Sequence, residues 1–271
     1  MIFAHDKGRL CNNILQFAHV YAWGREHGKR VMSMRFAYKY RYFKICHTAR
    51  HNFFNYLIAK YGSRWGFLPV VHFDYPEADY SHEERVMLQR HNVVVEGWYA
   101  RWYDLFLKYK SEIIEMFAFD KQVMLYPRRF LDSLQKSDIL LGMHIRRGDY
   151  KDFYGGLYYF SDEQYISQIR QFLRIHSEKR VQVLVCGNER SLNQQAYRQA
   201  FPNVSIEFPC GNPGEDLYLL SQCDYLIGPP STFSLVASMY RNVPLYWIED
   251  ANRELCMESF DTFDHLFRNI K

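Results

Sequence analysis

The sequence lacks the cysteine patterns that mark metal sites and redox centres. Its six cysteines form no CxxC pair, and no Cys/His cluster has zinc-ligand spacing. We therefore predict reduced thiols in a cytoplasmic protein. No apolar run reaches the roughly 18 residues that a membrane-spanning helix needs, and the N-terminus lacks the apolar core of a signal peptide. These absences predict a chain that is soluble, or at most peripheral at the inner face of a membrane.

Nucleotide-binding fingerprints are also missing. The sequence has no GxGxxG and no P-loop motif, so neither a typical dinucleotide fold nor a P-loop is supported. It has no DxD triplet to hold a divalent metal between phosphates, and no internal repeat or Gly/Ser linker. The net charge is +4, from 34 basic and 30 acidic residues. That excess is too small to indicate nucleic acid, but it permits an anionic small ligand.

The composition is that of a globular protein. The chain has 271 residues, 48% of them hydrophobic and 24% charged, which suits one large domain or two lobes. Aromatic residues make up 18% of the chain. This content fits a carbohydrate-facing surface, but aromatic-rich packing is the commoner reason for it.

The two halves of the chain differ in pattern. Apolar residues with a period near 3.6 predict a first helix that stops at Gly28. In the second half, strands and helices alternate as in a parallel, doubly wound sheet of the α/β class. We place the boundary between lobes of residues 1–137 and 138–271. The predicted strands are 30–36, 92–100, 139–145, 181–187, 204–208, 224–228 and 244–248, and the other predicted helices are 51–62, 103–119, 161–176, 189–201, 214–223 and 231–242.

Charged residues follow directly from one strand that looks buried. The segment ILLGMHI runs into RRGDY, so that His144, Arg146, Arg147 and Asp149 come at the strand's end. Side chains alternate across a strand, so His144 and Arg146 share a side and should point to the carboxyl edge of the sheet, where ligands bind. A guanidinium there can bind phosphate through two parallel hydrogen bonds. The plainer interpretation is a salt bridge between one arginine and Asp149.

A second strand end carries a complementary feature. After Gly228 and two prolines, Ser231, Thr232 and Phe233 open a helix. Helix N-termini bind anions through free N–H groups and the helix dipole, although Ser231 could be an ordinary N-cap. With Arg146, this helix start predicts a pyrophosphate site. Such a site needs no metal, because protein donors can neutralise a leaving diphosphate.

Three separated motifs, in order across residues 8–247, resemble those of the alpha-1,2-fucosyltransferases. HIRRGDY resembles their HxRRxDY signature, which has related forms in alpha-1,6- and protein O-fucosyltransferases. DLYLLSQCDYLIGPPSTFSLVASM resembles their second region, and GRLCNNILQFAHVYA resembles their N-terminal GGLGNQMFQYA motif. The resemblance implies a two-lobed GT-B-like glycosyltransferase with a Rossmann-like C-terminal donor lobe. It also implies inverting, metal-independent transfer of fucose from GDP-fucose to a glycan acceptor, at O2 of a galactoside.

The resemblance further implies roles for matching residues. Arg146 contacts the diphosphate and His144 the nucleotide, and Asp149 completes the catalytic set. Asp216 matches a position of the second region, although it could also be ordinary charge at a helix start. The other donor-binding positions are Arg147, Asn188, Ser231, Thr232 and Phe233, together with Gly8, Leu10 and Asn12 of an N-terminal loop that faces the donor across the cleft.

The sequence departs from the family pattern at several positions. Cys11 replaces the loop glycine, and Leu235 and Val236 replace a pair of aromatics. Asn188 stands where relatives often place an aspartate that accepts two hydrogens from guanine. Guanine preference is therefore less secure than the phosphate site. These departures indicate a divergent branch, such as one in bacterial polysaccharide biosynthesis.

The general base remains open at this level. Asp149 is the nearest carboxylate, but pairing with Arg147 would lower its pKa and make it a poor base. Glu96 is another candidate, although a strand-end surface acid is the plainer interpretation. A strongly dissociative reaction needs little base.

The aromatic and basic segment 35–45 could hold a lipid-linked or polysaccharide acceptor at a membrane surface. Its plainer interpretation is a half-buried strand with a solvated basic face. Two other functions stay open: a transferase for another nucleotide-linked sugar, and a non-catalytic carbohydrate-binding relative. A nucleotide-dependent oxidoreductase is disfavoured, because the glycine fingerprint is missing.

Overall fold

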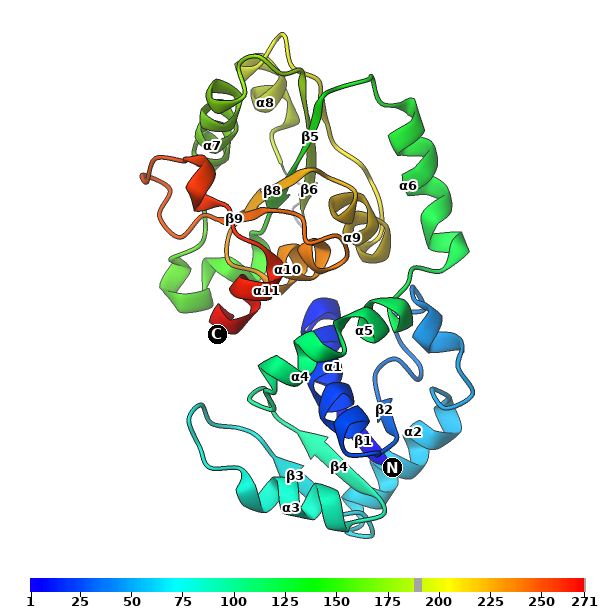
Figure 1. The fold of residues 1–271 in the computed structure, drawn as a ribbon. Coiled ribbons are helices and arrows are strands. Elements are labelled where there is room, and N and C mark those ends of the chain that lie inside the picture. Colours follow the sequence, from blue (N-terminus) through cyan, green and yellow to red (C-terminus); the bar gives the residue numbers. More distant parts are fainter. Residues whose placement is uncertain (188–191, 271) are drawn as a thin grey trace. The chain divides into compact units, whose positions relative to one another are not determined.

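The structure is a computed structural model of the chain, and it describes residues 1–187 and 192–270. The chain divides into two compact units, Met1–Gln122 and Val123–Lys271, each with its own parallel sheet (Figure 1). The sequence placed this division at 137/138, and most of helix α6 (Lys121–Ser133), which precedes that point, groups with the second unit. All six cysteines are free thiols, as predicted. In the described part of the chain, no helix combines the length and the apolar character needed to cross a membrane.

The first unit is built on a four-stranded parallel sheet in the order β2-β1-β4-β3. Its core includes Phe3, Met32 and Val94 from three of these strands. The predicted first helix is present, and it is followed by Gly28 at a φ of 64°. The strands are β1 (Ile2–His5), β2 (Val31–Ser33), β3 (Val70–His72) and β4 (Val93–Glu96), and the helices are α1 (Leu10–Glu26), α2 (Phe53–Arg64), α3 (Ser81–Gln89), α4 (Tyr103–Lys108) and α5 (Lys110–Met116), with the 3-10 helix η1 (Lys44–His47).

Two predictions for this unit were wrong. The segment 35–45 is no strand: it forms turns, with one isolated bridge from Phe43 to Phe119 and the start of η1. Its phenylalanines pack inward instead, since Phe36 and Phe43 are buried with ring centroids 5.1 and 5.5 Å from that of Phe117. The single helix expected over 103–119 is two helices that meet at Tyr109.

The second unit has a five-stranded parallel sheet in the order β7-β6-β5-β8-β9. The alternation of strands and helices that the sequence predicts is therefore confirmed. Its strands are β5 (Ile139–Ile145), β6 (Val181–Gly187), β7 (Ile206–Glu207), β8 (Tyr225–Gly228) and β9 (Leu245–Trp247), and its helices after α6 are α7 (Asp162–Ile175), α8 (Gln194–Ala200), α9 (Pro213–Ser221), α10 (Thr232–Met239) and α11 (Phe263–Leu266), with the 3-10 helices η2 (Gly148–Lys151), η3 (Phe153–Gly156), η4 (Met257–Ser259) and η5 (Phe267–Asn269).

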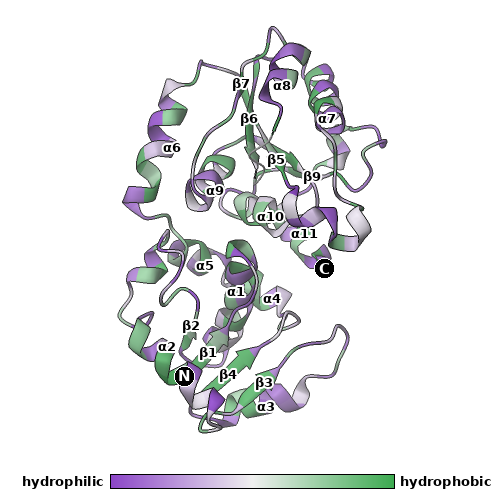
Figure 2. Ribbon diagram, turned by 180° about the vertical axis from the view of Figure 1, so that it is seen from behind, coloured by the Kyte–Doolittle hydropathy of each residue, from purple (hydrophilic) through white to green (hydrophobic). Residues whose placement is uncertain are grey.

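Helices cover both faces of the central strand β5, whose hydrophobic character is visible in Figure 2. The odd-numbered residues Leu141, Met143 and Ile145 belong to one core cluster with Tyr165 and other residues of α7 and α8. On the opposite face, a side chain at Gly142 would lie 2.6 Å from Leu226 and 2.9 Å from Leu220 of α9. The glycine therefore lets α9 approach the strand closely. This two-sided packing makes the sheet doubly wound.

Two helix starts in this unit follow the predicted chemistry. Ser161 and Gln164 form a capping box at α7, with their reciprocal bonds measuring 3.3 and 2.8 Å. The hydroxyl of Ser231 accepts the backbone N–H of Phe233 at 3.2 Å and caps α10. Each cap satisfies an N–H group that lacks an intrahelical partner. Both helices are thus anchored at the carboxyl edge of the sheet.

Candidate active site

The carboxyl ends of β5 and β8 meet in the second unit. The two strands are parallel neighbours, with Met143 opposite Ile227. Just beyond this pair, the carbonyl oxygen of His144 lies 2.7 Å from the point where a Cβ at Gly228 would be. The His144 ring stacks on Phe233, with centroids 5.1 Å apart and planes 24° apart. Two segments far apart in the sequence therefore lie side by side, and their role as one donor site stays a prediction.

Tyr150 fastens the signature segment to the start of α10. Its hydroxyl donates a 2.6 Å hydrogen bond to the carbonyl of Pro230, the residue before the cap Ser231. Burial raises the pKa of the Tyr150 phenol, so it remains a protonated donor. Ser231 is buried, and Thr232 and Phe233 are half-buried. The helix start and the segment after β5 are therefore held as one rigid edge.

Arg146 is held in place but keeps unused donor capacity. Its side chain is only 13% exposed, and its guanidinium lies 3.0 Å from the carboxylate of Asp149 and 5.3 Å from the ring centroid of Tyr150. Its buried Nε–H has no partner among the described residues. Because an unpaired buried donor is unfavourable, this atom favours an acceptor such as phosphate oxygen. Asp149 thus forms an ion pair with Arg146.

His144 is a neutral side chain. It is 3% exposed, and burial together with the nearby charge of Arg146 lowers its pKa to about 3. Its Nδ1 has no hydrogen-bond partner in the described part of the chain. A neutral imidazole can donate or accept one hydrogen bond at each nitrogen. The residue is therefore suited to bind a polar ligand and unsuited to carry positive charge.

Arg147 points to the other face of the sheet. Its guanidinium pairs with Asp162 at 2.7 Å and donates to the carbonyl of Phe160 at 3.1 Å. Asp162 also accepts a 2.9 Å hydrogen bond from the hydroxyl of Tyr197. Side chains alternate along the strand, so Arg147 lies on the same side as Ile145, which faces α7 and α8. The network therefore joins the end of β5 to these two helices. Its predicted role in donor binding stays a prediction, but its observed partners are structural.

Arg147→Ala is expected to destabilise the protein by about 3 kcal/mol, because it removes the cationic partner of the largely buried Asp162 carboxylate and leaves it only the Tyr197 hydroxyl. The two side chains are only 10% and 18% exposed. Urea unfolding measures the effect. Arg180→Ala is the matched control, since the ion pair of Arg180 with Asp138 is exposed and such pairs contribute at most about 1 kcal/mol. Equal losses in both variants would contradict the structural role.

Asp216 is a half-buried carboxylate in the first turn of α9. Its Oδ1 has no partner among the described residues. Burial and the nearby charge of Glu215 raise its pKa to about 7. The helix start does not depend on it, because Asn212 and Glu215 already form a capping box there. Asp216 therefore has unused acceptor capacity beside the edge of the sheet where β6 ends.

Asn188 directly follows β6 and lies outside the described residues.

The N-terminal loop lies in the first unit. There Gly8 has a φ of 90°, and a Cβ on it would lie 2.7 Å from the side chain of Asn12. Asn13 donates to the carbonyl of Arg9 at 3.0 Å, and Leu10 is buried. The loop is therefore well ordered, and the role of Gly8, Leu10 and Asn12 toward a donor stays a prediction.

The first unit gathers ionisable groups at the carboxyl edge of its own sheet. Burial raises the pKa of Asp6 to about 8, although the Ser33 hydroxyl hydrogen-bonds to it. Sequence reasoning missed this residue, which directly follows β1. Glu96 lies 2.5 Å from His5 and 3.0 Å from Lys7. Burial alone would raise the pKa of Glu96, but these two hydrogen bonds hold it below its usual value.

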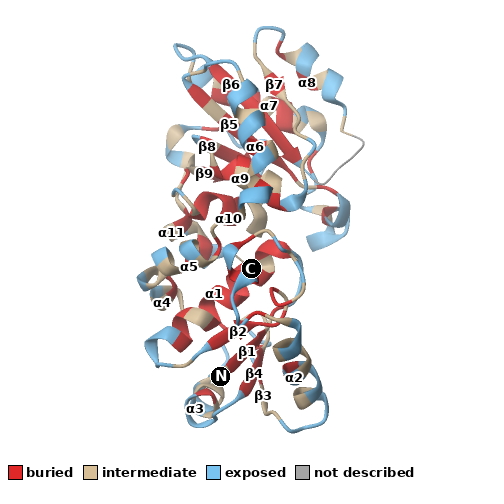
Figure 3. Cartoon of the chain, turned by 90° about the vertical axis from the view of Figure 1, so that its right-hand side faces the viewer, coloured by how far each residue is buried: buried red, intermediate tan, exposed pale blue. Residues whose placement is uncertain are grey.

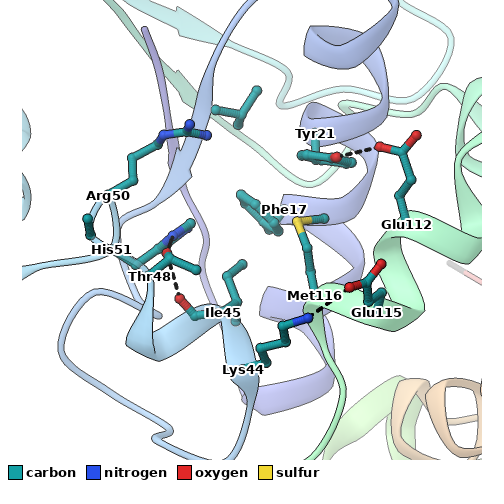
Figure 4. Close-up of a pocket in the computed structure, with 12 residues that line it drawn as sticks. Phe17, Tyr21, Lys44, Ile45, Thr48, Arg50, His51, Glu112, Glu115 and Met116 are labelled. Atoms are coloured by element: carbon teal, nitrogen blue, oxygen red, sulfur yellow. Dashed lines mark hydrogen bonds and ion pairs between the residues drawn. The ribbon is translucent and has the colours of Figure 1, made fainter.

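A cavity of about 610 Å³ lies within the first unit (Figure 4). Phe17 and Tyr21 of α1 contribute aromatic rings, and the Tyr21 hydroxyl donates to Glu112 at 2.8 Å. Polar groups around an apolar lining are typical of small-molecule pockets. The lining residues are Phe17, Tyr21, Val31, Lys44, Ile45, Thr48, Ala49, Arg50, His51, Glu112, Glu115 and Met116.

Comparisons with known proteins give a structural answer. No family model matches the chain, and no curated protein matches it in sequence. A structure of an Arabidopsis thaliana FUT1 variant in complex with GDP aligns over 96% of this chain and 73% of that one, with a TM-score of 0.68 at 15% identity. The chain has a GT-B fold.

Two further structures share the GT-B fold. NodZ alpha-1,6-fucosyltransferase soaked with GDP-fucose aligns over 90% of this chain and 94% of that one, with a TM-score of 0.56 at 13% identity. POFUT1 in complex with GDP-fucose aligns over 89% and 93%, with a TM-score of 0.55 at 11% identity. The GT-B-like fold class predicted from the sequence is confirmed.

Proposed function

We propose that the protein transfers fucose from GDP-fucose to a hydroxyl group of a glycan acceptor. The observation that carries the proposal is the convergence of Arg146, His144 and the α10 start at one sheet edge, where two buried polar atoms lack partners among the described residues. The structural neighbours, which hold GDP or GDP-fucose, support this choice of donor. The signature HIRRGDY supports O2 of a galactoside as the acceptor atom.

The diphosphate is the group that this edge stabilises best. As the bond between fucose and phosphate breaks, negative charge grows on the departing GDP. Arg146 and the N–H groups at the start of α10 are fixed before the reaction, so they stabilise that charge without reorganising. Such donors make a divalent metal unnecessary at the leaving group. The acceptor hydroxyl attacks from the opposite side of the sugar carbon, which inverts its configuration.

The carboxylate of Asp216 is the proposed hydrogen-bond acceptor for guanine. The N1–H and N2–H₂ groups of guanine are two adjacent donors, and a carboxylate can accept both. The partnerless Oδ1 of Asp216 and its pKa of about 7 indicate an acid that lacks compensating hydrogen bonds. Binding of guanine would satisfy both oxygens and favour the ionised form. Asn188, which lies outside the described residues, is also proposed to bind the donor.

The acceptor is proposed to bind the first unit, whose cavity offers aromatic rings and carboxylates. The base stays open: Asp149 pairs with Arg146, and Glu96 pairs with His5 and Lys7. The hydrogen bonds from His5 and Lys7 hold the pKa of Glu96 below its usual value, which makes it a poor general base. We therefore propose a dissociative reaction in which the acceptor proton leaves late, after the new carbon–oxygen bond has begun to form, and passes to the departing diphosphate or to water. Contact with a membrane or a lipid-linked glycan is proposed for the same unit.

Nucleotide-dependent thermal stabilisation tests the donor site. GDP at a hundredfold excess over its dissociation constant should add about 2.7 kcal/mol of stability, and EDTA should leave this gain unchanged. UDP, CMP and ADP at equal concentrations are the controls. Preference for one of them would replace fucose by another nucleotide-linked sugar. No response to any nucleotide would favour a carbohydrate-binding protein without activity.

A further inference from the structure

Helix α2 presents an apolar surface that the first unit does not cover. Ala59 is its only buried residue, and Figure 3 shows most of the helix as exposed or intermediate. Phe54, Ile58, Tyr61 and Trp65 are spaced by three or four positions, which places them on one stripe. We call the exposed apolar residues here the α2 surface: Phe53 (56% exposed), Phe54 (71%), Ile58 (44%), Tyr61 (36%), Trp65 (64%) and Phe67 (77%).

The aromatic residues of the α2 surface support one another. The rings of Tyr61 and Trp65 have centroids 5.2 Å apart, and those of Trp65 and Phe67 are 6.3 Å apart. Because Phe67 contacts Trp65, the segment after the helix extends the same surface. Soluble monomers rarely expose a contiguous apolar patch of this kind without a binding role.

The charge around the α2 surface has one sign. From His27 to Phe73 the chain contains no Asp or Glu, although the whole chain has 30 of them. Lys60 and Arg64 lie on the same helix as the apolar stripe, Arg50 precedes the helix, and all three are exposed. The Lys and Arg residues of this stretch are Lys29, Arg30, Arg35, Lys39, Arg41, Lys44, Arg50, Lys60 and Arg64.

We propose that the α2 surface docks on the anionic headgroup region of a phospholipid bilayer. Trp, Tyr and Phe rings insert at the boundary of headgroups and acyl chains, and adjacent Lys and Arg bind anionic lipids. Arg50, Lys60 and Arg64 supply those cations. A second copy of the chain is a poorer occupant, because a symmetric contact would set this positive surface against itself.

The proposal changes the place of the membrane contact that the sequence suggested. In segment 35–45 the phenylalanines are buried. The Tyr38 hydroxyl already accepts a hydrogen bond of 2.7 Å from the guanidinium of Arg35. Anchors must be exposed to enter lipid. The α2 surface meets that condition, and it does so whatever donor the second unit binds.

Vesicle co-sedimentation tests the proposal. The full chain should bind vesicles of phosphatidylcholine and phosphatidylglycerol in equal parts, and bind phosphatidylcholine alone at least about tenfold more weakly. Phe54→Ser with Trp65→Ser should lose at least about tenfold in affinity for the anionic vesicles. Leu88→Ser with Leu125→Ser is the matched control, because these leucines are also exposed, at 42% and 50%, and it should bind as the wild type does.

A second pair of variants tests the charge. Lys60→Glu with Arg64→Glu should lower anionic-vesicle affinity by about tenfold or more, whereas Lys121→Glu with Arg129→Glu, at exposed positions elsewhere, should not. Circular dichroism confirms that each variant is folded. Equal binding to both vesicle types, or to neither, would overturn the proposal. Self-association in sedimentation velocity that Phe54→Ser with Trp65→Ser abolishes, without vesicle binding, would assign the surface to a second copy.

Discussion

Arg146→Ala is expected to lower kcat for fucosyl transfer by about 10²–10³-fold, the usual cost of removing one preorganised donor from a site of developing charge. Just beyond β5, Arg146 has a nearly buried guanidinium whose Nε–H has no partner among the described residues. The expected loss arises because alanine offers nothing to the departing diphosphate. Radiolabelled fucose transfer to a galactoside acceptor measures it, and GDP affinity should fall as well.

The fold should survive this substitution. The ion-pair partner Asp149 is 44% exposed, so water can replace the guanidinium. The free energy of unfolding should therefore fall by only about 1 kcal/mol. Arg146→Lys should recover only part of the activity, because an ammonium group cannot make two parallel hydrogen bonds. Arg180→Ala, an exposed arginine of the same unit, should keep full turnover. Wild-type turnover in Arg146→Ala would refute the donor site.

Asp216→Asn is expected to have two opposite effects: it weakens GDP binding and stabilises the free protein. An asparagine offers guanine one carbonyl instead of a carboxylate, so affinity should fall by about tenfold to a hundredfold, as for a lost charge-assisted pair. Without nucleotide, the variant should be more stable above pH 7 by roughly 2–4 kcal/mol. The reason is that the wild type must ionise there a half-buried acid whose Oδ1 has no partner among the described residues.

The sign of the pH dependence follows from the raised pKa of Asp216. Its folded-state pKa of about 7 exceeds the ordinary 3.8, so between these values the folded state binds more protons than the unfolded state. Wild-type stability should therefore fall as pH rises from about 4 to about 7, and Asp216→Asn should remove this slope. GDP affinity should weaken below pH 7, because binding requires the ionised carboxylate.

Unfolding by urea at several pH values, with and without nucleotide, checks both effects. Asp132→Asn, at an exposed position of α6, is the control and should change neither. Inosine diphosphate lacks the N2 amine of guanine, so it should bind the wild type more weakly than GDP and bind Asp216→Asn about equally. An unchanged preference for GDP in the variant would assign guanine recognition elsewhere.

The sequence predicted the second unit well, because its elements have strong local signals. Strand and helix alternate there, and Ser161 and Ser231 cap helices as expected. The alternation of side chains along the strand also predicted that His144 and Arg146 share a side. The same alternation places Arg147 and Arg146 on opposite sides. Only the structure reveals that Arg147 pairs with Asp162, which lies on another element.

The first unit was harder to predict, because long-range packing decides its local structure. Segment 35–45 alternates aromatic and basic residues like a strand, yet Phe43 is drawn into an aromatic cluster with Phe117. Asp6 gave no motif, since its burial depends on the fold around it. Nor does a helical period in α2 tell which face is covered: Ala59 is buried while Trp65 stays exposed.

The opposite orientations of Arg146 and Arg147 restrict how this sequence can diverge. Inserting or deleting one residue in β5 would exchange the two arginines between the faces of the sheet. The fold would then lose the partner of Asp162, and the donor edge would lose its guanidinium, in a single event. Related chains should therefore differ freely in which apolar residues fill β5, since similar volumes are tolerated, but they should keep its length unchanged.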